Sequence, residues 1–198
     1  MQRMVGEPQD DAALMLAYAA GDAAAFERLY QQHKGPLFRY LMRHLRDREL
    51  ANDLFQDVWG RLIAARKSYQ PRARFQTYLF TLAHNCIVDH WRRINVRPVG
   101  NSVTLDPDDA HPSLRAAEHE GPEQRAREDE TKLQLRAALA ALPREQRDAF
   151  LLYEESGLSL DDIAAVMGVG IETAKSRLRY AVAKLREQLA PLAEEEFE

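Results

Sequence analysis

The chain has 198 residues, of which 45% are hydrophobic and 29% are charged, and its net charge is −4. This composition is typical of a globular protein with room for one domain or two small ones. No apolar run approaches the roughly 18 residues of a membrane span, so we expect no membrane insertion. The N-terminal residues lack a signal-peptide pattern, and the single Cys86 excludes an internal disulfide and fits the reducing cytoplasm.

The charge is distributed unevenly along the chain. Residues 66–97 contain seven Lys or Arg and one Asp, and residues 170–186 contain five basic residues and one Glu. Residues 98–130 between them contain nine acidic and three basic residues. Two basic stretches separated by an acidic connector are compatible with nucleic-acid binding despite the negative net charge.

The N-terminal part predicts several helices. We expect one helix over residues 11–20 and a second that begins after Asp22, a favourable N-cap, and buries apolar residues spaced three and four apart. The Gly35-Pro36 pair is expected to bend or interrupt this second helix. His33 and His44 fall among its core positions, where packing accounts for them better than metal binding does.

The next predicted helix, residues 49–65, has two contrasting faces. Leu54, Val58 and Leu62 repeat at helical spacing and form an apolar side. The opposite side is rich in acids and amides, and its members are Glu49, Asn52, Asp53, Gln56 and Asp57. Such a face is either a solvated helix surface or a docking site for a basic helix of a partner, and the residues alone do not decide between the two.

A basic loop at residues 66–74 precedes a long predicted helix over residues 75–93. The helix is apolar on more than one face and also carries Trp91, Arg92 and Arg93. Interleaved basic and aromatic side chains suit single-stranded nucleic acid, because bases stack on the rings while phosphates are neutralised. A core helix with ordinary surface arginines is an equally good interpretation of the residues alone.

Four residues of this helix, His84, Cys86, Asp89 and His90, invite a metal or nucleophile hypothesis that their spacing does not support. His84 and Cys86 point to different sides of a helix, and the two ligands Cys86 and His90 do not make a structural zinc site. No Gly-rich loop would supply an oxyanion hole for a Cys–His nucleophile. We therefore predict no metal, no cofactor and no catalytic residue.

Residues 97–128 have the composition of a linker, with four prolines, several acids and few large apolar residues. A structureless stretch of this length predicts two domains, residues 11–96 and residues 129–190. The predicted fold class is all-α, with two small helical domains joined by a flexible acidic linker. The second domain is expected to be a four-helix unit that ends in a helix-turn-helix and closes near Pro191.

The predicted helix-turn-helix spans residues 158–189. Ser159 is the expected N-cap of its first helix, and Gly168-Val169-Gly170 is the expected turn. The polar face of the second helix and its flanks carry Glu172, Thr173, Lys175, Ser176, Arg177, Arg179 and Tyr180. Polar and cationic side chains near the start of a second helix are what a DNA recognition helix needs, although a helical hairpin with solvated basic residues has the same pattern.

Three stretches together carry a family resemblance. Residues 51–59 read ANDLFQDVW, residues 75–93 read FQTYLFTLAHNCIVDHWRR, and LPREQR at residues 142–147 precedes TAKSRL at residues 173–178. In order and spacing they resemble regions 2 and 4 of bacterial RNA polymerase sigma factors of the sigma-70 family, in the compact extracytoplasmic-function (ECF) branch. The third region of larger sigma factors is missing, and the acidic linker takes its place.

The resemblance implies two partners, core RNA polymerase and promoter DNA. Asp53, Gln56 and Asp57 would dock on the basic clamp-helix coiled coil of the largest polymerase subunit. The residues implied at the unpaired minus-10 element are Arg66, Lys67, Tyr69, Arg72, Arg74, Tyr78, Asn85, Trp91, Arg92 and Arg93. Those implied at the duplex minus-35 element are Thr173, Lys175, Ser176, Arg177, Arg179 and Tyr180.

The implied function is that of a cytoplasmic, non-enzymatic ECF sigma factor that directs core polymerase to specific promoters and helps to open the minus-10 DNA. An anti-sigma factor is a further implied partner. We expect the free protein to bind DNA weakly, because its net charge is negative and its two modules are loosely tethered. The alternative, a stand-alone dimeric helix-turn-helix regulator, would need a two-fold operator and would leave the acidic helix face without a role.

Overall fold

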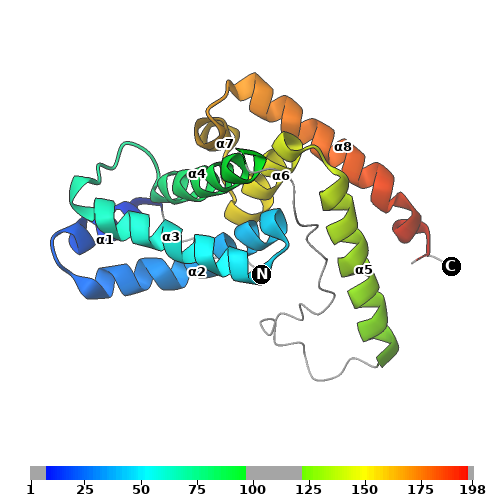
Figure 1. Cartoon of the computed structure of the whole chain (residues 1–198), viewed down its shortest axis with the longest axis horizontal. Coiled ribbons are helices and arrows are strands. Elements are labelled where there is room, and N and C mark those ends of the chain that lie inside the picture. Colours follow the sequence, from blue (N-terminus) through cyan, green and yellow to red (C-terminus); the bar gives the residue numbers. More distant parts are fainter. Residues whose placement is uncertain (1–7, 97–121, 196–198) are drawn as a thin grey trace.

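The computed structural model describes residues 8–96 and 122–195, and every regular element within these ranges is a helix (Figure 1). The N-terminal module consists of α1 (Pro8–Ala19), α2 (Ala23–Leu45), α3 (Arg48–Ala65), the short 3₁₀ helix η1 (Arg66–Ser68) and α4 (Phe75–Val96). The C-terminal module consists of α5 (Pro122–Ala141), α6 (Arg144–Ser156), α7 (Leu160–Met167) and α8 (Ile171–Glu195). The predicted all-α class with two helical domains is confirmed.

Three helix boundaries differ from those expected. α2 continues through Gly35-Pro36 without a break, because Leu37 and Leu41 beyond the proline are fully buried and hold the following turns in the core. α5 begins at Pro122, a favoured residue type for the first turn, inside the stretch assigned to the linker. α8 runs past Pro191 to Glu195. The rest of the predicted linker, residues 97–121, lies outside the described residues.

Side-chain caps set the beginnings of two long helices in the N-terminal module. The Asp22 carboxylate accepts hydrogen bonds from the backbone N–H groups of Ala24 and Ala25, at 2.9 and 3.3 Å, as expected for the N-cap of α2. Asp47 caps α3 in the same way by accepting from the N–H of Leu50 at 3.0 Å. These caps satisfy backbone donors that have no partner within the helix.

An aromatic cluster fixes α3 against α2. Trp59 is 5% exposed, and its ring lies 5.7 Å from that of Phe26, 5.1 Å from that of Tyr30 and 6.2 Å from that of Phe55. Edge-to-face and tilted pairs of this kind contribute attraction beyond the burial of their area. The cluster therefore holds α3 rigidly while its acidic face points to solvent.

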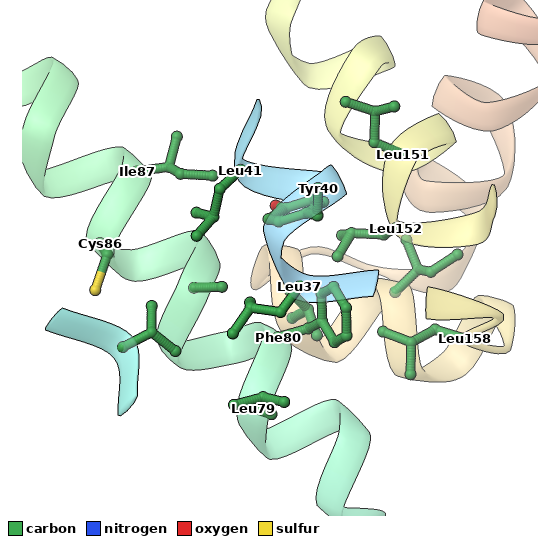
Figure 2. Packing of buried hydrophobic residues seen from close by; sticks show 14 of the residues in the cluster. Leu37, Tyr40, Leu41, Leu79, Phe80, Cys86, Ile87, Leu151, Leu152 and Leu158 are labelled. Atoms are coloured by element: carbon green, nitrogen blue, oxygen red, sulfur yellow. The ribbon is translucent and has the colours of Figure 1, made fainter. Parts of the chain in front are cut away.

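Helices α6 and α7 pack directly against α2 and α4, a contact that we refer to as the interdomain seam. Figure 2 shows Tyr40 of α2 and Phe80 of α4 beside Leu152 of α6 and the nearby Leu158, within one continuous core. The expectation of loosely tethered modules in the free protein is thus corrected. The physical reason is that α4 is apolar on two faces, and the second face packs against the C-terminal module.

The seam leaves the remaining helices at opposite ends of the molecule. In Figure 1, α1 to α3 lie on one side of α4, while α5 and α8 extend away on the other side and diverge from each other. Among the described helices, none combines the length and the apolar character that a membrane span requires.

Candidate nucleic-acid interface

The acidic face of α3 presents the three residues that were predicted to bind a partner protein. Asp53, Gln56 and Asp57 are all exposed. Asp57 Oδ2 accepts from Arg61 at 2.9 Å and from the thiol of Cys86 on α4 at 3.4 Å. Burial raises the pKa of Cys86 to about 12, so the thiol keeps the proton that it donates. Asp57 is therefore already paired with Arg61 and Cys86, and Asp53 and Gln56 are exposed on the same face.

The aromatic residue of the basic loop at residues 66–74 is buried and packs against α4. Tyr69 is only 9% exposed, and its ring lies 6.4 Å from that of Phe75 and 5.3 Å from that of Tyr78. The structure thus places Tyr69 in the core and not on the outer surface, where a stacking role would require it. Its local effect is to shape the loop.

The cations of this loop divide into one inward and three outward groups. The Arg66 guanidinium donates to the carbonyl of Ile63 at 2.9 Å and lies 5.9 Å from the ring centroid of Tyr18 on α1. This position makes Arg66 a structural link between the loop and α1. The exposed cations are Lys67, Arg72 and Arg74.

The outer face of α4 continues the surface of the loop. Tyr78, Asn85 and Arg92 follow one another at seven-residue spacing, two helical turns, and therefore lie on one line along the helix. Asn85 and Arg92 are exposed, Tyr78 is half-buried, and the adjacent Arg93 is exposed as well. Because Tyr78 contacts Tyr69, this outer stripe begins where the loop ends.

Trp91 belongs to a different, inner stripe of α4. Thr77, His84 and Trp91 also recur every seven residues, and all three contact the C-terminal module. The Thr77 hydroxyl donates to Asp162 at 2.7 Å, and the Arg144 guanidinium lies 5.7 Å from the ring centroid of Trp91. The structure therefore does not bring Trp91 together with the other residues predicted for single-stranded DNA.

Helices α7 and α8 form the predicted helix-turn-helix. Ser159 is the N-cap of α7, since its hydroxyl oxygen accepts from the backbone N–H of Asp162 at 3.2 Å. Gly168 ends α7 with a φ of +65°, a backbone conformation that glycine adopts without strain. Ala174, Ala181 and Leu185 of α8 are buried, so the opposite face of the helix is left for solvent or a ligand.

The predicted recognition residues divide by exposure. Those exposed on α8 are Thr173, Lys175, Arg179 and Tyr180. The Arg179 guanidinium lies 5.1 Å from the ring centroid of Tyr180, which groups a cation and an aromatic surface. The Ser176 hydroxyl already donates a hydrogen bond to the carbonyl of Glu172 at 2.7 Å, so its proton is not available to DNA. Arg177 is half-buried on the side of α8 that approaches the seam.

A buried titratable cluster lies in the seam, and the sequence analysis did not predict it. Asp148 of α6 is 3% exposed, with Oδ1 3.2 Å from His44 Nδ1 and Oδ2 3.9 Å from His84 Nδ1. Burial raises the pKa of Asp148 to about 6, lowers the pKa of His84 to about 4, and holds the pKa of His44 well below its ordinary value. The only sequence signal was a set of polar residues at positions where apolar stripes were expected.

Ion pairs extend the seam to its edge. Arg39 and Arg43, on successive turns of α2, both donate to the carboxylate of Glu155 at 2.7 and 2.8 Å. The Glu155 side chain is 7% exposed, so its charge depends on these two arginines for compensation. Close by, the side-chain amide of Gln76 donates to the carbonyl of Ser156 at 2.8 Å.

Comparison with known proteins identifies both modules. Residues 29–96 match the family Sigma-70 region 2, and residues 132–185 match the family Sigma-70, region 4. The ECF RNA polymerase sigma factor SigM of Mycobacterium tuberculosis is 30% identical over 184 residues, which cover 93% of this chain and 87% of that protein. The chain belongs to the ECF branch of the sigma-70 family. This sigma factor accordingly binds core RNA polymerase and directs it to promoters, and the stand-alone regulator is not favoured.

Solved structures of other sigma factors share the fold. CnrH, solved in complex with the cytosolic domain of CnrY, has a TM-score of 0.67 at 21% identity, with 92% of this chain and 98% of that chain covered. The sigma factor RpoE of Bartonella quintana, solved with the anti-sigma factor NepR, has a TM-score of 0.64 at 24% identity, with coverage of 83% and 96%. At these identities the structural similarity shows a shared arrangement of the helices, that is, a shared fold.

Proposed function

We propose that this sigma factor uses three separate surfaces in transcription initiation. The acidic face of α3 binds core polymerase, the basic loop with the outer stripe of α4 binds the minus-10 element, and the exposed face of α8 binds the minus-35 element. The observation that carries the proposal is that the exposed residues of each surface lie on an element of sigma region 2 or region 4, in the order that the family requires.

Docking to polymerase would depend on Asp53 and Gln56. Both project from a helix held in place by the aromatic cluster, so little side-chain and backbone ordering is needed on binding. Asp57 is already paired with Arg61, which lessens its own attraction for a basic partner. An acidic face of this kind is complementary to a basic polymerase helix and speeds the encounter between the two proteins.

Opening of the minus-10 element would depend on the outer stripe. Extrusion of a base costs a few kcal/mol in lost stacking and pairing. Tyr78 offers a partly exposed ring for stacking, and Asn85 offers amide groups that can form hydrogen bonds with a base edge. The cations that would hold the separated strand are Lys67, Arg72, Arg74, Arg92 and Arg93. Tyr69 and Arg66 would act indirectly, by shaping the loop.

Recognition of the minus-35 element would depend on the first turns of α8. Lys175 and Arg179 would contact phosphates and guanine edges in the major groove, with Tyr180 and Thr173 beside them. Phosphate contacts of this kind fix the register of the polymerase on the duplex. The protein would thus contribute binding free energy and no bond chemistry, and would act in the cytoplasm where polymerase transcribes.

An anti-sigma factor is a proposed further partner. CnrH was solved in complex with the cytosolic domain of CnrY, and RpoE of Bartonella quintana was solved in complex with an anti-sigma factor. Both resemble this protein over most of its length, which supports regulation by a partner protein here as well.

Run-off transcription with core polymerase tests the proposal. Templates are genomic promoter fragments, including the region upstream of this gene. We expect Asp53→Ala/Gln56→Ala and Lys175→Ala/Arg179→Ala each to reduce specific transcripts at least about tenfold, because losses of about 1.4 kcal/mol or more are typical for such contacts. Matched controls are Glu27→Ala/Gln31→Ala, an exposed acid and amide on α2, and Lys184→Ala/Arg186→Ala further along α8; both should transcribe normally.

Two results separate the proposal from its alternative. Loss of polymerase binding in the Asp53/Gln56 variant, with loss of promoter selection in the Lys175/Arg179 variant, supports the polymerase-binding and minus-35 surfaces. Tight duplex binding without polymerase, no transcript, and no effect of the Asp53/Gln56 change would instead indicate a stand-alone regulator.

A further inference from the structure

The interdomain seam combines apolar contacts with incompletely satisfied polar groups. Within the described part of the chain, several of the buried atoms without a hydrogen-bond partner lie here: Tyr40 Oη, His44 Nε2, His84 Nδ1 and Arg144 Nη2. Asp148 Oδ1 has His44 Nδ1 at 3.2 Å. Each such atom disfavours the packed state, because water would bond to it once the helices separate. Apolar contacts and the outer ion pairs therefore stabilise the closed seam, whereas the polar groups at its centre destabilise it.

Closure of the seam also occupies groups that belong to the two DNA-binding surfaces. Trp91 lies under the Arg144 guanidinium, and Arg177 lies near enough to His84 for its charge to act there. Both residues are among those that the family resemblance implies at promoter DNA, Trp91 at the minus-10 element and Arg177 at the minus-35 element. The closed arrangement and DNA binding would then compete for them.

We propose that the seam is a reversible closed state of the protein, that proton uptake by His44 and His84 opens it, and that opening releases Trp91 and Arg177 for promoter DNA. The inference rests on the proposed function, with Trp91 added to the minus-10 surface and Arg177 to the minus-35 surface, only for the role of these two released residues. The proton-linked opening itself rests on the burial of both imidazoles in the closed state and on the arginines around them, which oppose a positive charge on either ring. The Asp148 carboxyl group, 3.2 and 3.9 Å from the two rings, acts in the opposite direction when it is ionised.

Every element packed around Asp148 contributes a charge or a titratable group. The groups that face the cluster are Tyr40 and His44 on α2, His84 on α4, Arg144, Glu145 and Arg147 on α6, and Arg177 on α8. The three arginines outnumber the acids, so their charges add to the effect of burial in opposing protonation of either imidazole.

The direction of the pH dependence follows from the pKa values of the three central groups. Both imidazoles have lowered pKa values in the closed state and return to about 6.5 in water, so opening takes up protons below that pH. Asp148, with its pKa raised to about 6, loses its proton on opening and partly cancels this uptake. Two gains against one loss leave a net uptake, and acidification from about pH 7.5 to about pH 5.5 should raise the ratio of open to closed protein roughly 25-fold.

Energy transfer between two dyes on the full-length chain measures this ratio. The dyes are attached through Gln32→Cys on α2 and Glu187→Cys on α8, both exposed positions, with Cys86→Ser to remove the native thiol. We expect transfer to fall as the pH is lowered while circular dichroism shows that the helices persist. In His44→Gln/His84→Gln the response should reverse, because Asp148 alone takes up a proton on closing.

A second variant keeps the test independent of the double substitution. Asp148→Asn retains a hydrogen-bonding group but cannot bind the proton that opposes opening, so its acid-induced opening should be steeper than that of the wild type. A wild-type distance that does not change with pH, or an acid response that is the same in His44→Gln/His84→Gln, would overturn the proposal. Because neither polymerase nor DNA is present, failure here is distinguishable from failure of the transcription assay.

Discussion

The aromatic cluster of the N-terminal module and the interdomain seam are both buried, but their chemistry differs. The cluster consists of rings in tilted and edge-to-face contact around Trp59. The seam contains ion pairs, two imidazoles and a carboxyl group, and it has several buried polar atoms without partners where the cluster has the indole nitrogen of Trp59. Burial alone therefore does not identify a permanent core. The first region fixes the helix that presents the acidic face proposed to bind polymerase, whereas the second is proposed to separate without unfolding either module.

The largest expected effect comes from removing the ring at the centre of the cluster. Trp59→Ala should lower the free energy of unfolding by about 3–5 kcal/mol, because a large buried side chain is lost and a cavity remains. The matched control is Trp91→Ala, where the half-buried ring meets Arg144 at the seam and the loss should be about 1–2 kcal/mol. Urea unfolding followed by circular dichroism measures both. Equal losses would contradict the distinction between the two regions.

An intermediate effect is expected at the edge of the seam. Glu155→Gln removes the charge that compensates Arg39 and Arg43, and it should weaken closure by about 1–2 kcal/mol, a factor of roughly 5–30 in the ratio of closed to open protein. The dye-pair distance at neutral pH reports this change, while helix content should stay constant. The exposed neighbour provides the control, since Glu154→Gln should leave the distance unaltered. A similar shift in both variants would show that the ion pairs do not hold the seam.

The smallest expected effect tests a single hydrogen bond across the seam. Thr77→Val removes the hydroxyl that donates to Asp162, and it should weaken closure by about 0.5–1.5 kcal/mol. Asp162 keeps its hydrogen bond from Ser159, so no buried charge is left without a donor. Thr81→Val is the matched control, because the Thr81 hydroxyl donates only within its own helix, to the carbonyl of Thr77. The same distance measurement should separate the two variants, and identical behaviour would exclude a role for this bond in closure.

Features that depend on neighbouring residues in the chain could be predicted from the sequence. The cap at Ser159 and the turn at Gly168 follow from the conformational preferences of those residues, and the acidic face of α3 follows from helical periodicity. The buried positions of α8 follow from the same periodicity. Each of these needs only the identity of residues a few positions apart.

Features that depend on which surfaces meet could not be predicted in this way. The sequence showed that α4 is apolar on more than one face, but it did not show that the second face packs against α6 and α7. The contact of Trp91 with Arg144 depends on that packing. The inward position of Tyr69 depends on how its loop folds onto Phe75 and Tyr78 of α4. The pairing of His44 with Asp148, more than a hundred residues later, has no local signal at all.

The position of Cys86 has a practical consequence. It is the only cysteine of the chain, it is buried where α4 meets α3, and its pKa is raised to about 12. Alkylating reagents react with the thiolate, so a folded N-terminal module should resist them almost completely. The rate at which a small alkylating reagent adds mass to the native chain therefore measures how often Cys86 becomes exposed by separation of α4 from α3, and no engineered probe is needed.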